Sequence, residues 1–216
     1  MHSTRSEEES DLLAVLEATH GTASSPPAQV SRPVTPERSY PVVVGVAETP
    51  VGFLSVAVTN RGVAACTFDP EEVLTARLAR TVSARIGTCD RRLDPVRRQL
   101  NRYFDGQSVS FSLTLDLRLV SDFGRAVLRA TRDIPYGGVT THESIAERIG
   151  RPEALRAVRN SLLTNPLCVL LPCHRAVSVD YPHDVGEYAG GHAAKRYLLS
   201  LEERADPPVT LEPTTV

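Results

Sequence analysis

The chain has 216 residues, a formal net charge of −2 and a sequence pI near 6.3, with 41% hydrophobic and 23% charged residues. These values are typical of a globular protein of one or two domains, and they argue against a strongly basic, sequence-independent nucleic-acid binder. No apolar run approaches the ~18 residues of a transmembrane helix. The acidic stretch at residues 1–9 lacks the apolar core of a secretory signal, so we expect a cytoplasmic protein that does not enter a membrane.

The chain contains four cysteines, Cys66, Cys89, Cys168 and Cys173, and no C-x-x-C pair. In a cytosolic chain of this length, four such cysteines do not make a disulfide framework. Cys168, Cys173 and His174 carry ligand atoms that zinc accepts, but their spacing fits no common structural zinc site. We therefore predict no metal.

The two ends of the chain differ in composition from its middle. Residues 1–39 are rich in Ser, Thr, Pro and acidic residues, a composition that buries too little apolar surface to offset the entropy of ordering. We expect a flexible linker there and a second disordered tail at 206–216. The residues between them divide into an α/β unit at 40–117 and a mostly helical unit at 118–205.

The unit at 40–117 mixes β-rich runs with helical patterns. Expected in chain order are strands over 42–46, 53–58 and 63–68, a helix over 70–84, a helix from Asp94 to Asp105 and a strand over 108–117. Strict apolar–polar alternation makes 108–117 the clearest strand of the chain. The buried sides of the two helices are predicted to contain Val73, Leu74, Leu78 and Val82 in the first, and Val96, Leu100, Tyr103 and Phe104 in the second. Cys66 is predicted to be a core residue.

Three helices are expected in the first half of the unit at 118–205. Ser121 is predicted to cap the first. Thr140 and Glu143, three residues apart, have the spacing of a capping box and are predicted to open the second. After a glycine turn, Pro152 opens the third, which continues to about Leu163. Two short helices joined by a tight turn make a candidate helix-turn-helix.

The third of these helices has two distinct faces at 100° per residue. Leu155, Val158 and Leu162 form one stripe that is predicted to pack inward, whereas Arg156, Arg159, Asn160 and Leu163 lie on or beside another. The second face is either a nucleic-acid-facing surface, whose arginines enter a groove, or the solvated face of an ordinary helix.

The stretch from Asn165 to Val177 carries the clearest chemical signal. An apolar run leads into Pro172-Cys173-His174-Arg175, so that a thiol stands beside an imidazole and a guanidinium. Positive charge lowers the pKa of a thiol, and the thiolate is the nucleophilic form. From this segment alone, an activated nucleophile and a buried cysteine that acts as a small hydrophobe are both open interpretations.

Several motifs follow one another in a fixed order. They are Ile134-Pro135-Tyr136-Gly137, the candidate helix-turn-helix, Arg156-Ala157-Val158, Asn165-Pro166, Pro172-Cys173-His174-Arg175, Gly186 to Gly191, and Lys195 to Glu202. The set resembles the O6-alkylguanine-DNA alkyltransferase family, also called methylated-DNA–protein-cysteine methyltransferases. The resemblance covers about residues 40–205 and is strongest over 121–204. It implies an α/β (α+β) fold, with a small ribonuclease-H-like N-terminal α/β unit followed by a mostly helical, helix-turn-helix C-terminal domain.

The resemblance implies a stoichiometric repair reaction on double-stranded DNA that contains O6-alkylguanine, carried out by a monomer. The helix-turn-helix enters the minor groove, an arginine in the position of Arg156 replaces the extruded nucleotide, and the thiolate of Cys173 takes the alkyl group irreversibly. No organic cofactor is needed, because the damaged DNA is itself the alkyl donor.

The same resemblance assigns roles to individual residues. His174 accepts the Cys173 proton through a water, Glu202 orients His174, and Asn165 ties the active-site turn to the recognition helix. Arg175 is expected to hold the turn. The DNA-binding residues implied are Arg156, His142, Arg159 and Asn160, and the substrate pocket is implied to contain Tyr188, Ala189, Gly190, Ala176 and Lys195.

The sequence departs from the family pattern at four places. His142 stands where the family usually has Tyr, Arg159 and Asn160 where it has a small residue, and Ala189 where Ser is common. The loop over 177–185 is longer than usual. Three functions therefore stay open, namely an active alkyl acceptor, an alkylated-DNA-binding or regulatory protein with weak or no transfer, and a thiol enzyme or non-DNA methyl acceptor on the same scaffold.

Overall fold

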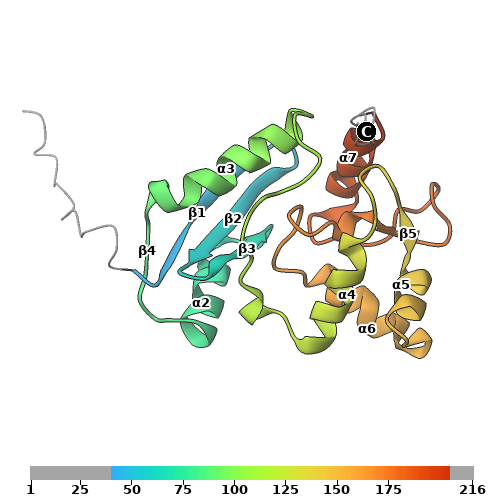
Figure 1. Ribbon diagram of the computed structural model, residues 1–216, viewed down its shortest axis with the longest axis horizontal. Coiled ribbons are helices and arrows are strands. Elements are labelled where there is room, and N and C mark those ends of the chain that lie inside the picture. The colour runs from blue at the N-terminus through green and yellow to red at the C-terminus, as the bar shows by residue number, and fades with distance from the viewer. Residues whose placement is uncertain (1–39, 205–216) are drawn as a thin grey trace, which may run out of the picture. The chain divides into compact units, whose positions relative to one another are not determined.

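The computed structural model describes residues 40–204, which form a small sheet with two helices followed by a mostly helical part (Figure 1). The strands are β1 (Val42–Thr49), β2 (Gly52–Thr59), β3 (Gly62–Thr67), β4 (Ile86–Gly87), β5 (Thr140–Thr141) and β6 (Ala176–Val177). The helices are α2 (Glu71–Thr81), α3 (Asp90–Phe104), α4 (Asp122–Arg132), α5 (His142–Arg148), α6 (Leu155–Leu163) and α7 (Gly191–Arg204). Short 3₁₀ turns lie at Leu117–Leu119, Pro152–Ala154 and Cys173–Arg175.

These elements confirm the expected mixed α/β fold class. The tails expected at 1–39 and 206–216 fall outside the described residues. Between residues 40 and 204, no helix has the length and apolar character needed to cross a membrane.

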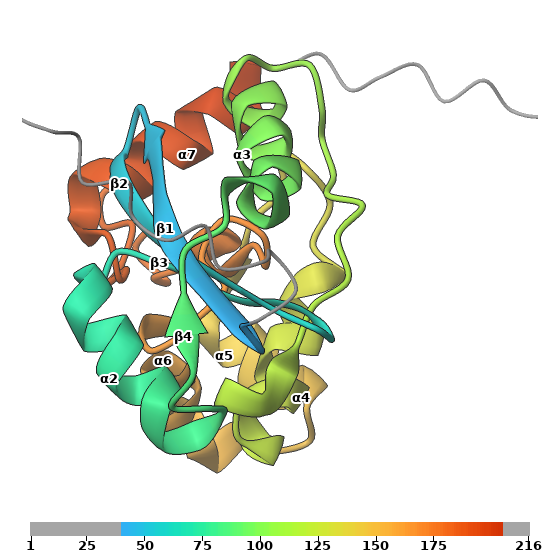
Figure 2. The ribbon, with the colours of Figure 1, turned by 90° about the vertical axis from the view of Figure 1, so that its left-hand side faces the viewer.

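The main sheet has the strand order β3-β2-β1-β4, with antiparallel hairpins along β1, β2 and β3 and a short parallel pairing of β4 with β1. Alternate residues of β1 point to opposite faces, so Val42 and Val44 pack with α2, whereas Val43 belongs to the cluster that contains α3. The views in Figures 1 and 2 agree that the two helices cover the sheet. The three predicted strands are confirmed, and each extends to the adjoining turn.

Both predicted helices of this unit exist, with corrections. In α2, Leu74 and Leu78 are buried as expected, but Val73 is 54% exposed and was wrongly assigned to the buried side. Helix α3 begins at Asp90, four residues before the predicted start, because Leu93 is buried in the core ahead of Pro95. Pro95 therefore lies inside the helix, where it has no N–H to donate, and the helix forms in spite of this cost. The predicted core positions of α3 are all buried, and so is Cys66.

The strand predicted over 108–117 is wrong. The segment contributes only one isolated bridge, in which Val63 N donates to Thr114 O at 2.8 Å and Asp116 N donates to Val63 O at 2.8 Å. A second segment pairs with the same edge of β3, because Cys66 N donates to Pro166 O at 2.7 Å farther along the strand. The apolar alternation instead places side chains inward from an extended segment that lacks a continuous partner strand.

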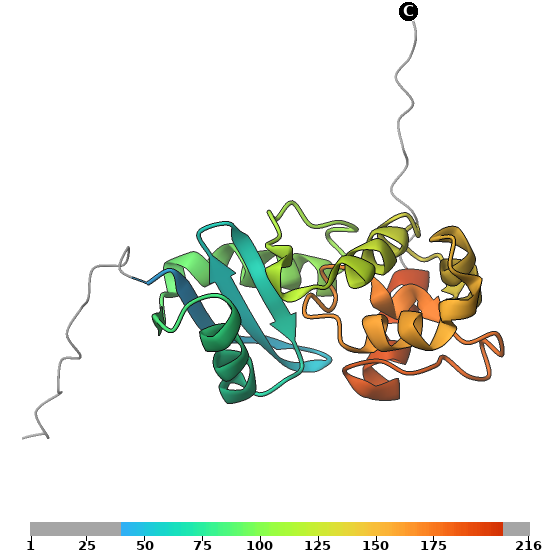
Figure 3. The same cartoon turned by 90° about the horizontal axis from the view of Figure 1, so that it is seen from below.

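The helical part begins with α4, which Ser121 caps as predicted, its Oγ accepting from Gly124 N at 3.1 Å. Helices α5 and α6 pack against each other and against α4, which supports the predicted helix-turn-helix (Figure 3). The predicted capping box at Thr140 is wrong by one residue. Thr141 Oγ1 accepts from Ser144 N at 3.1 Å, whereas Thr140 pairs with Ala176 in the small parallel sheet of β5 and β6.

A single apolar cluster extends from the main sheet through α3 into α4, α5, α6 and α7. Leu54 of β2, Leu100 of α3 and Leu198 of α7 all belong to it. Residues on both sides of the predicted boundary at 117 and 118 therefore belong to one core. The division into units at 40–117 and 118–205 stays a prediction.

Candidate active site

The apolar run after α6 folds into a tight turn rather than an extended strand. Leu170 N donates to Cys168 O at 2.8 Å, and Leu171 N donates to Leu167 O at 2.9 Å. Val169 has φ of 69°, a left-handed conformation that is rare and strained for a β-branched residue. The surrounding core holds this conformation, since all five residues are buried. The turn carries the chain from the end of α6 to Cys173.

Asn165 holds this turn at both ends, as predicted. Its Oδ1 accepts from Leu167 N at 2.9 Å, and its Nδ2 lies 3.5 Å from Leu171 O and 3.1 Å from Cys173 Sγ. Asn165 N also donates to Leu162 O of α6 at 3.3 Å. The backbone of Asn165 thus bonds to α6, while its side chain bonds to the turn and donates directly to the sulfur.

Cys173 opens a 3₁₀ turn and is 2% exposed. A hydrogen bond from the Cys168 thiol lowers the pKa of Cys173, burial opposes this, and the Asn165 amide and the charge of Lys195 lower the pKa further. The net direction is downward, which favours the nucleophilic thiolate. In contrast, burial alone raises the pKa of Cys66 to about 12, so the two buried thiols differ in their surroundings.

His174 is fully buried and points one ring nitrogen at Glu202, with Nε2 2.8 Å from Oε1. Burial lowers the pKa of His174, and the neighbouring carboxylate only partly compensates. The ring is therefore neutral at physiological pH, and its Nε2–H donates to Glu202. This tautomer leaves Nδ1 as an acceptor, and Nδ1 is buried without a hydrogen-bond partner.

Glu202 receives five hydrogen bonds from four residues. They come from Tyr103 Oη at 2.6 Å, His174 Nε2 at 2.8 Å, Arg175 Nε at 2.8 Å and Nη2 at 3.0 Å, and Gly137 N at 3.1 Å. Burial by itself raises the pKa of Glu202, but hydrogen bonds and charge from His174 and Arg175 lower it to about 2. The carboxylate is therefore ionised, and it fixes the tautomer of His174.

Arg175 holds the active-site turn, as predicted. Besides its bonds to Glu202, its Nη1 donates to Ile134 O at 2.7 Å, and its guanidinium lies 5.6 Å from the centre of the Tyr136 ring. Arg175 thus joins the Ile134–Gly137 motif by a hydrogen bond to its backbone, and it also forms an ion pair with Glu202. Arg175 is 8% exposed, so this pair is screened little by solvent.

Lys195, the single lysine of the sequence, lies fully buried in α7. Its Nζ donates to Ala176 O at 2.6 Å and to Glu187 O at 3.1 Å. Burial lowers the pKa of Lys195 to about 8, although the charge of Cys173 opposes this. Lys195 therefore joins the residue after the Cys-His-Arg turn to the 186–191 segment, and it supplies positive charge near the thiol.

The 186–191 segment closes the site from a third side. Tyr188 is 5% exposed, its ring lies edge-on to the rings of His174 and Phe68, and its hydroxyl is buried without a hydrogen-bond partner. Gly190 packs on Phe68 so closely that a Cβ would lie 2.5 Å from the phenyl ring. Ala189 is half-buried beside them. Tyr188 and Gly190 thus both pack on Phe68, and Tyr188 also lies against His174.

His142 lies at the start of α5 and is 5% exposed. Burial lowers its pKa to about 4, and the charges of Lys195 and Arg159 lower it further, so His142 is neutral. It lines a cavity of about 190 Å³ together with Arg159, Leu162, Ser178, Asp184, Gly186 and Glu187. Its Nδ1 is a second buried nitrogen without a partner.

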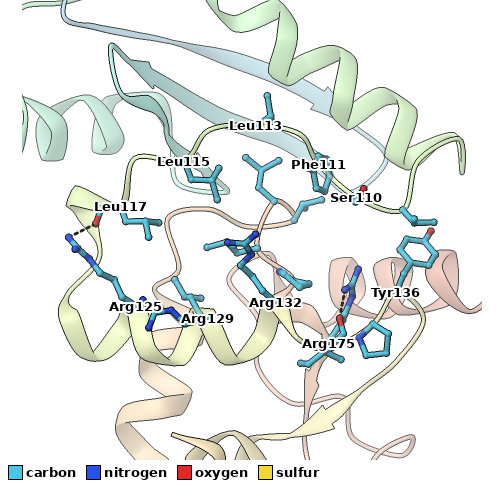
Figure 4. A pocket seen from close by; sticks show the side chains of 18 residues that line it. Ser110, Phe111, Leu113, Leu115, Leu117, Arg125, Arg129, Arg132, Tyr136 and Arg175 are labelled. Carbon is cyan, nitrogen blue, oxygen red and sulfur yellow. Dashed lines mark hydrogen bonds between the residues drawn. The ribbon is translucent and has the colours of Figure 1, made fainter. Parts of the chain in front are cut away.

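A larger cavity of about 620 Å³ lies on the other side of the active-site turn (Figure 4). The 109–117 segment, α4 and residues 169–172 form its walls, and Arg125, Arg129, Arg132 and Arg175 contribute its cationic groups. Neither Cys173 nor His142 lines it. Arg125 Nη2 donates to Leu117 O at 3.1 Å, so this arginine holds the segment in place. Cys173 lines neither cavity, and of the predicted DNA-binding residues His142 and Arg159 line the smaller one.

The exposed face of α6 contains three of the four predicted DNA-binding residues, whereas the fourth, His142, is buried in α5. Arg156, Arg159 and Asn160 are exposed, whereas Val158 and Leu162 are buried and Leu155 is half-buried. Arg159 Nη2 lies 3.2 Å from Glu143 Oε1 of α5, a pair that is partly exposed on both sides. Arg159 and His142 thus line the same cavity, whereas the Arg156 side chain makes no hydrogen bond or ion pair with any other residue of 40–204.

The longer loop over 177–185 is fixed to α7 by its own apolar contacts. Val177 and Val185 form a cluster with Leu199, and Tyr181 packs against it. Asp184 Oδ1 accepts from Gly186 N at 2.9 Å. The extra length is therefore taken up in a packed turn next to the smaller cavity.

Several residues of the site were not identified from the sequence. Tyr103 and Gly137 bind Glu202, Cys168 Sγ donates to Asn165 O, and Ser178 and Gly186 line the smaller cavity. Gly137 and Gly186 belong to motifs of the sequence, and their glycines are the available signal. Nothing local to Tyr103 marks it, because its partner is 99 residues away. Among residues 40–204, no group of three or more His, Cys, Asp or Glu side chains forms a metal site.

Comparison with known proteins gives the same picture along the chain. Residues 122–204 match the model of the 6-O-methylguanine DNA methyltransferase DNA-binding domain, and residues 42–117 match that of its ribonuclease-like domain. A methylated-DNA–protein-cysteine methyltransferase of Mycolicibacterium paratuberculosis is 33% identical over 165 residues, which cover 74% of this chain and 92% of that protein. The Methanosarcina barkeri protein of the same name is 41% identical over 109 residues, covering 49% of this chain and 65% of its own length.

Solved structures agree with these sequences. The O6-methylguanine methyltransferase of Mycobacterium tuberculosis superimposes with a TM-score of 0.64 at 30% identity, over 77% of this chain and 96% of that one. Mycobacterium tuberculosis OGT, solved in complex with DNA, gives a TM-score of 0.64 at 30% identity, over 76% and 95% of the two chains. With the described fold and the matches on both sides of residue 120, the chain belongs to the 6-O-methylguanine DNA methyltransferase family.

Proposed function

We propose that this protein binds double-stranded DNA, extrudes an O6-alkylguanine and transfers the alkyl group irreversibly to its own Cys173. The observation that carries the proposal is one 3₁₀ turn that holds a buried thiol next to a neutral histidine, whose Nδ1 has no hydrogen-bond partner and whose Nε2 contacts an ionised carboxylate. This is the nucleophile, base and orienting group that a thiolate displacement requires.

The reaction forms one bond and breaks one. Cys173 loses its proton to Nδ1 of His174 through a water, and its thiolate attacks the O6-bound alkyl carbon. The carbon–oxygen bond breaks, and the electron pair leaves with the guanine oxygen. Glu202 stabilises the charged His174, while Asn165 and Lys195 stabilise the thiolate before attack. A thioether is a poor leaving group, so each protein molecule acts once.

The base is proposed to enter by way of the smaller cavity. His142 Nδ1, His174 Nδ1 and Tyr188 Oη are buried polar atoms without partners, and buried polar atoms are seldom left unpaired unless they serve a ligand. These three atoms are suited to the polar edge of a purine. Cys173 is nearly enclosed, so Tyr188 and its neighbours have to shift when the base enters.

Arg156 is proposed to fill the gap in the base stack. It projects from the exposed face of α6, and a planar guanidinium stacks on neighbouring bases. Unstacking a base costs a few kcal/mol, and the inserted side chain recovers part of that cost. Arg159 and Asn160 are proposed to contact the DNA backbone from the same face.

All of the groups in this scheme come from one chain, so we propose that the acting form is a monomer, located in the cytoplasm, that needs no cofactor. The 42–117 and 122–204 matches support a division into a ribonuclease-like and a DNA-binding domain.

One observation favours a second function, binding of alkylated DNA with weak transfer. Arg159 places a long side chain where the family has a small residue, and its ion pair with Glu143 holds the guanidinium beside the smaller cavity. A base that cannot pass this rim would be recognised but not repaired.

The two functions are separated by one experiment. The protein is incubated with duplex DNA that contains O6-methylguanine, and its intact mass is measured. A gain of one methylene unit in mass, mapped to Cys173 and absent from Cys173→Ala, supports transfer. Tight binding of the lesion without a change in mass supports the second function, and a Cys66→Ala variant controls for methylation of another buried thiol.

A further inference from the structure

The cavity of about 620 Å³ on the other side of the active-site turn has no part in the proposed reaction, and its walls are mainly apolar. One wall is the 109–117 segment, whose alternating apolar side chains all line the cavity, namely Val109, Phe111, Leu113, Leu115 and Leu117. All five are half-buried. The alternation that resembles a strand in the sequence therefore builds the wall of a cavity.

The opposite wall comes from α4 and from the active-site turn. Leu128 and Ile134 line it together with residues 169–172, which lead directly to Cys173. A cavity of this size, with apolar walls and a few polar groups, is typical of sites that bind small molecules. Such walls favour a ligand with an apolar body, because that body leaves water when it binds.

The charged groups of the cavity are all positive. Arg125 and Arg175 line it, but backbone carbonyls and Glu202 already accept their hydrogen bonds. Arg132, in the last turn of α4, makes no hydrogen bond or ion pair with any other residue of 40–204. Figure 4 shows its side chain extending from α4 toward the 109–117 segment. No acidic side chain of the described residues lines the cavity, so its charge favours an anion.

Tyr136 adds an unpaired hydroxyl beside Arg175. The residue lines the cavity, and its Oη is buried without a hydrogen-bond partner among residues 40–204. Burial and the nearby Glu202 raise the pKa of Tyr136, so the phenol keeps its proton and can donate it. Buried hydroxyls are seldom left unpaired unless a ligand or a water serves them.

We propose that this cavity is a second binding site, and that its ligand is an amphipathic carboxylate. The apolar body lies along the 109–117 wall, and the carboxylate binds the guanidinium of Arg132, whose planar donors match two carboxylate oxygens. Tyr136 Oη offers the ligand a further donor. The site is independent of alkyl transfer, but its ligand contacts residues 169–172 of the active-site turn.

Binding of decanoate to the full chain, measured by isothermal titration calorimetry below the concentration at which micelles form, tests the site. Decyltrimethylammonium is the matched probe, with the same alkyl chain and the opposite charge. We expect decanoate to bind with a stoichiometry of one and the cation to bind at least tenfold more weakly. Failure of the parent protein to bind decanoate, or equal affinity for the two probes, overturns the proposal.

Variants of the cavity locate the bound decanoate. Arg132→Ala should weaken its binding about tenfold, because a charge-assisted contact is lost, and Tyr136→Phe about threefold. Leu115→Trp should abolish binding by filling the apolar wall. Arg80→Ala, at an exposed arginine of α2 that does not line the cavity, should match the parent. Equal weakening in the two arginine variants would mean attraction to net charge alone, which overturns the site.

Hydrogen exchange gives a second readout that does not depend on any variant. The amides of Leu170 and Leu171 donate to Cys168 O and Leu167 O within the active-site turn, and both residues line the cavity. Decanoate should slow the exchange of these two amides severalfold. Unchanged exchange there at saturating decanoate would place the ligand elsewhere and overturn the proposal.

Discussion

Tyr103 Oη of α3 donates to Glu202 Oε1 of α7 at 2.6 Å, so a helix that follows the main sheet contacts the carboxylate that binds His174. Tyr103 is 1% exposed, and burial together with the acidic partner raises its pKa. Glu202 is therefore held by residues from both halves of the described chain. We propose that this bond gives α3 a role in the reaction beyond packing.

Replacing Tyr103 with Phe removes one of the five donors to Glu202 and leaves the ring in place. We expect a three- to tenfold slower single-turnover transfer and a loss of about 1–2 kcal/mol in the free energy of unfolding, because a buried acceptor loses a charge-assisted bond. Quench-flow with O6-methylguanine duplex and urea titration measure the two effects. Tyr197→Phe, at an exposed tyrosine of α7, is the matched control, and equal rates in the two variants would contradict the role of Tyr103.

Glu202→Gln tests the charge of the carboxylate separately from its shape. His174 would lose its ionic partner and Arg175 would be left buried with a neutral one, so we expect transfer to slow by about ten- to a hundredfold and unfolding free energy to fall by about 3 kcal/mol. The loss of unfolding free energy should depend on pH. The pKa of Glu202 is lowered from 4.5 to about 2, so its contribution is complete above about pH 5 and is lost as pH falls toward 2.

Urea titrations of the parent and Glu202→Gln at pH 7, 4 and 3 check this dependence. The difference in stability between the two proteins should narrow at each step downward. A constant difference across this range would mean that Glu202 acts through hydrogen-bond geometry alone and not through its charge.

The parts of the site that were predictable from sequence are those with local signals. Cys173, His174 and Arg175 are adjacent in sequence. The exposed face of α6 follows from the helical period, and Ser121 is a residue type that commonly caps the start of a helix. These predictions depend on spacings of a few residues. They are correct because the backbone geometry of a helix or turn fixes the relative positions of residues that are close in sequence.

The errors came where a distant part of the chain decides the local structure. The 108–117 segment alternates like a strand, yet β3 shares its free edge between Thr114 and Pro166, so no ladder forms. The start of α3 moved to Asp90 because Leu93 finds a place in the core. Likewise the tight turn from Leu167 to Leu171 depends on a left-handed Val169, a conformation that residue propensity argues against.

Lys195 should impose an upper pH limit on transfer. Its pKa is lowered from 10.5 to about 8 by burial, so it loses its charge above pH 8 and then stabilises the Cys173 thiolate less. We expect the wild-type rate to rise with pH as Cys173 ionises and to fall by severalfold above about pH 8.5. Lys195→Met should be slower at pH 7 and lack this descending limb, provided that its circular dichroism is native.

The free energy of unfolding should rise with pH over the range in which the transfer rate falls. Between pH 8 and 10.5 the unfolded chain holds a proton on Lys195 that the folded chain has released, so this group makes the folded state more stable as pH rises. A transfer rate that stays level to pH 10 while this stability change is observed would separate Lys195 from the reaction.

Arg156→Ala should slow repair of duplex DNA by about ten- to a hundredfold, while alkyl transfer from the free alkylated base changes less than twofold. The side chain is exposed on α6 and touches neither Cys173 nor Glu202, so its removal leaves the chemistry of the thiol unchanged. The variant should extrude the base less easily, because unstacking takes a few kcal/mol and the inserted guanidinium offsets part of this free energy. Single-turnover rates on both substrates, at fixed salt, give the two effects.

Arg129→Ala, at an exposed arginine on α4, is the control for loss of one positive charge. Equal slowing on duplex and free base would remove the stacking role from Arg156 and place its effect on the folded site.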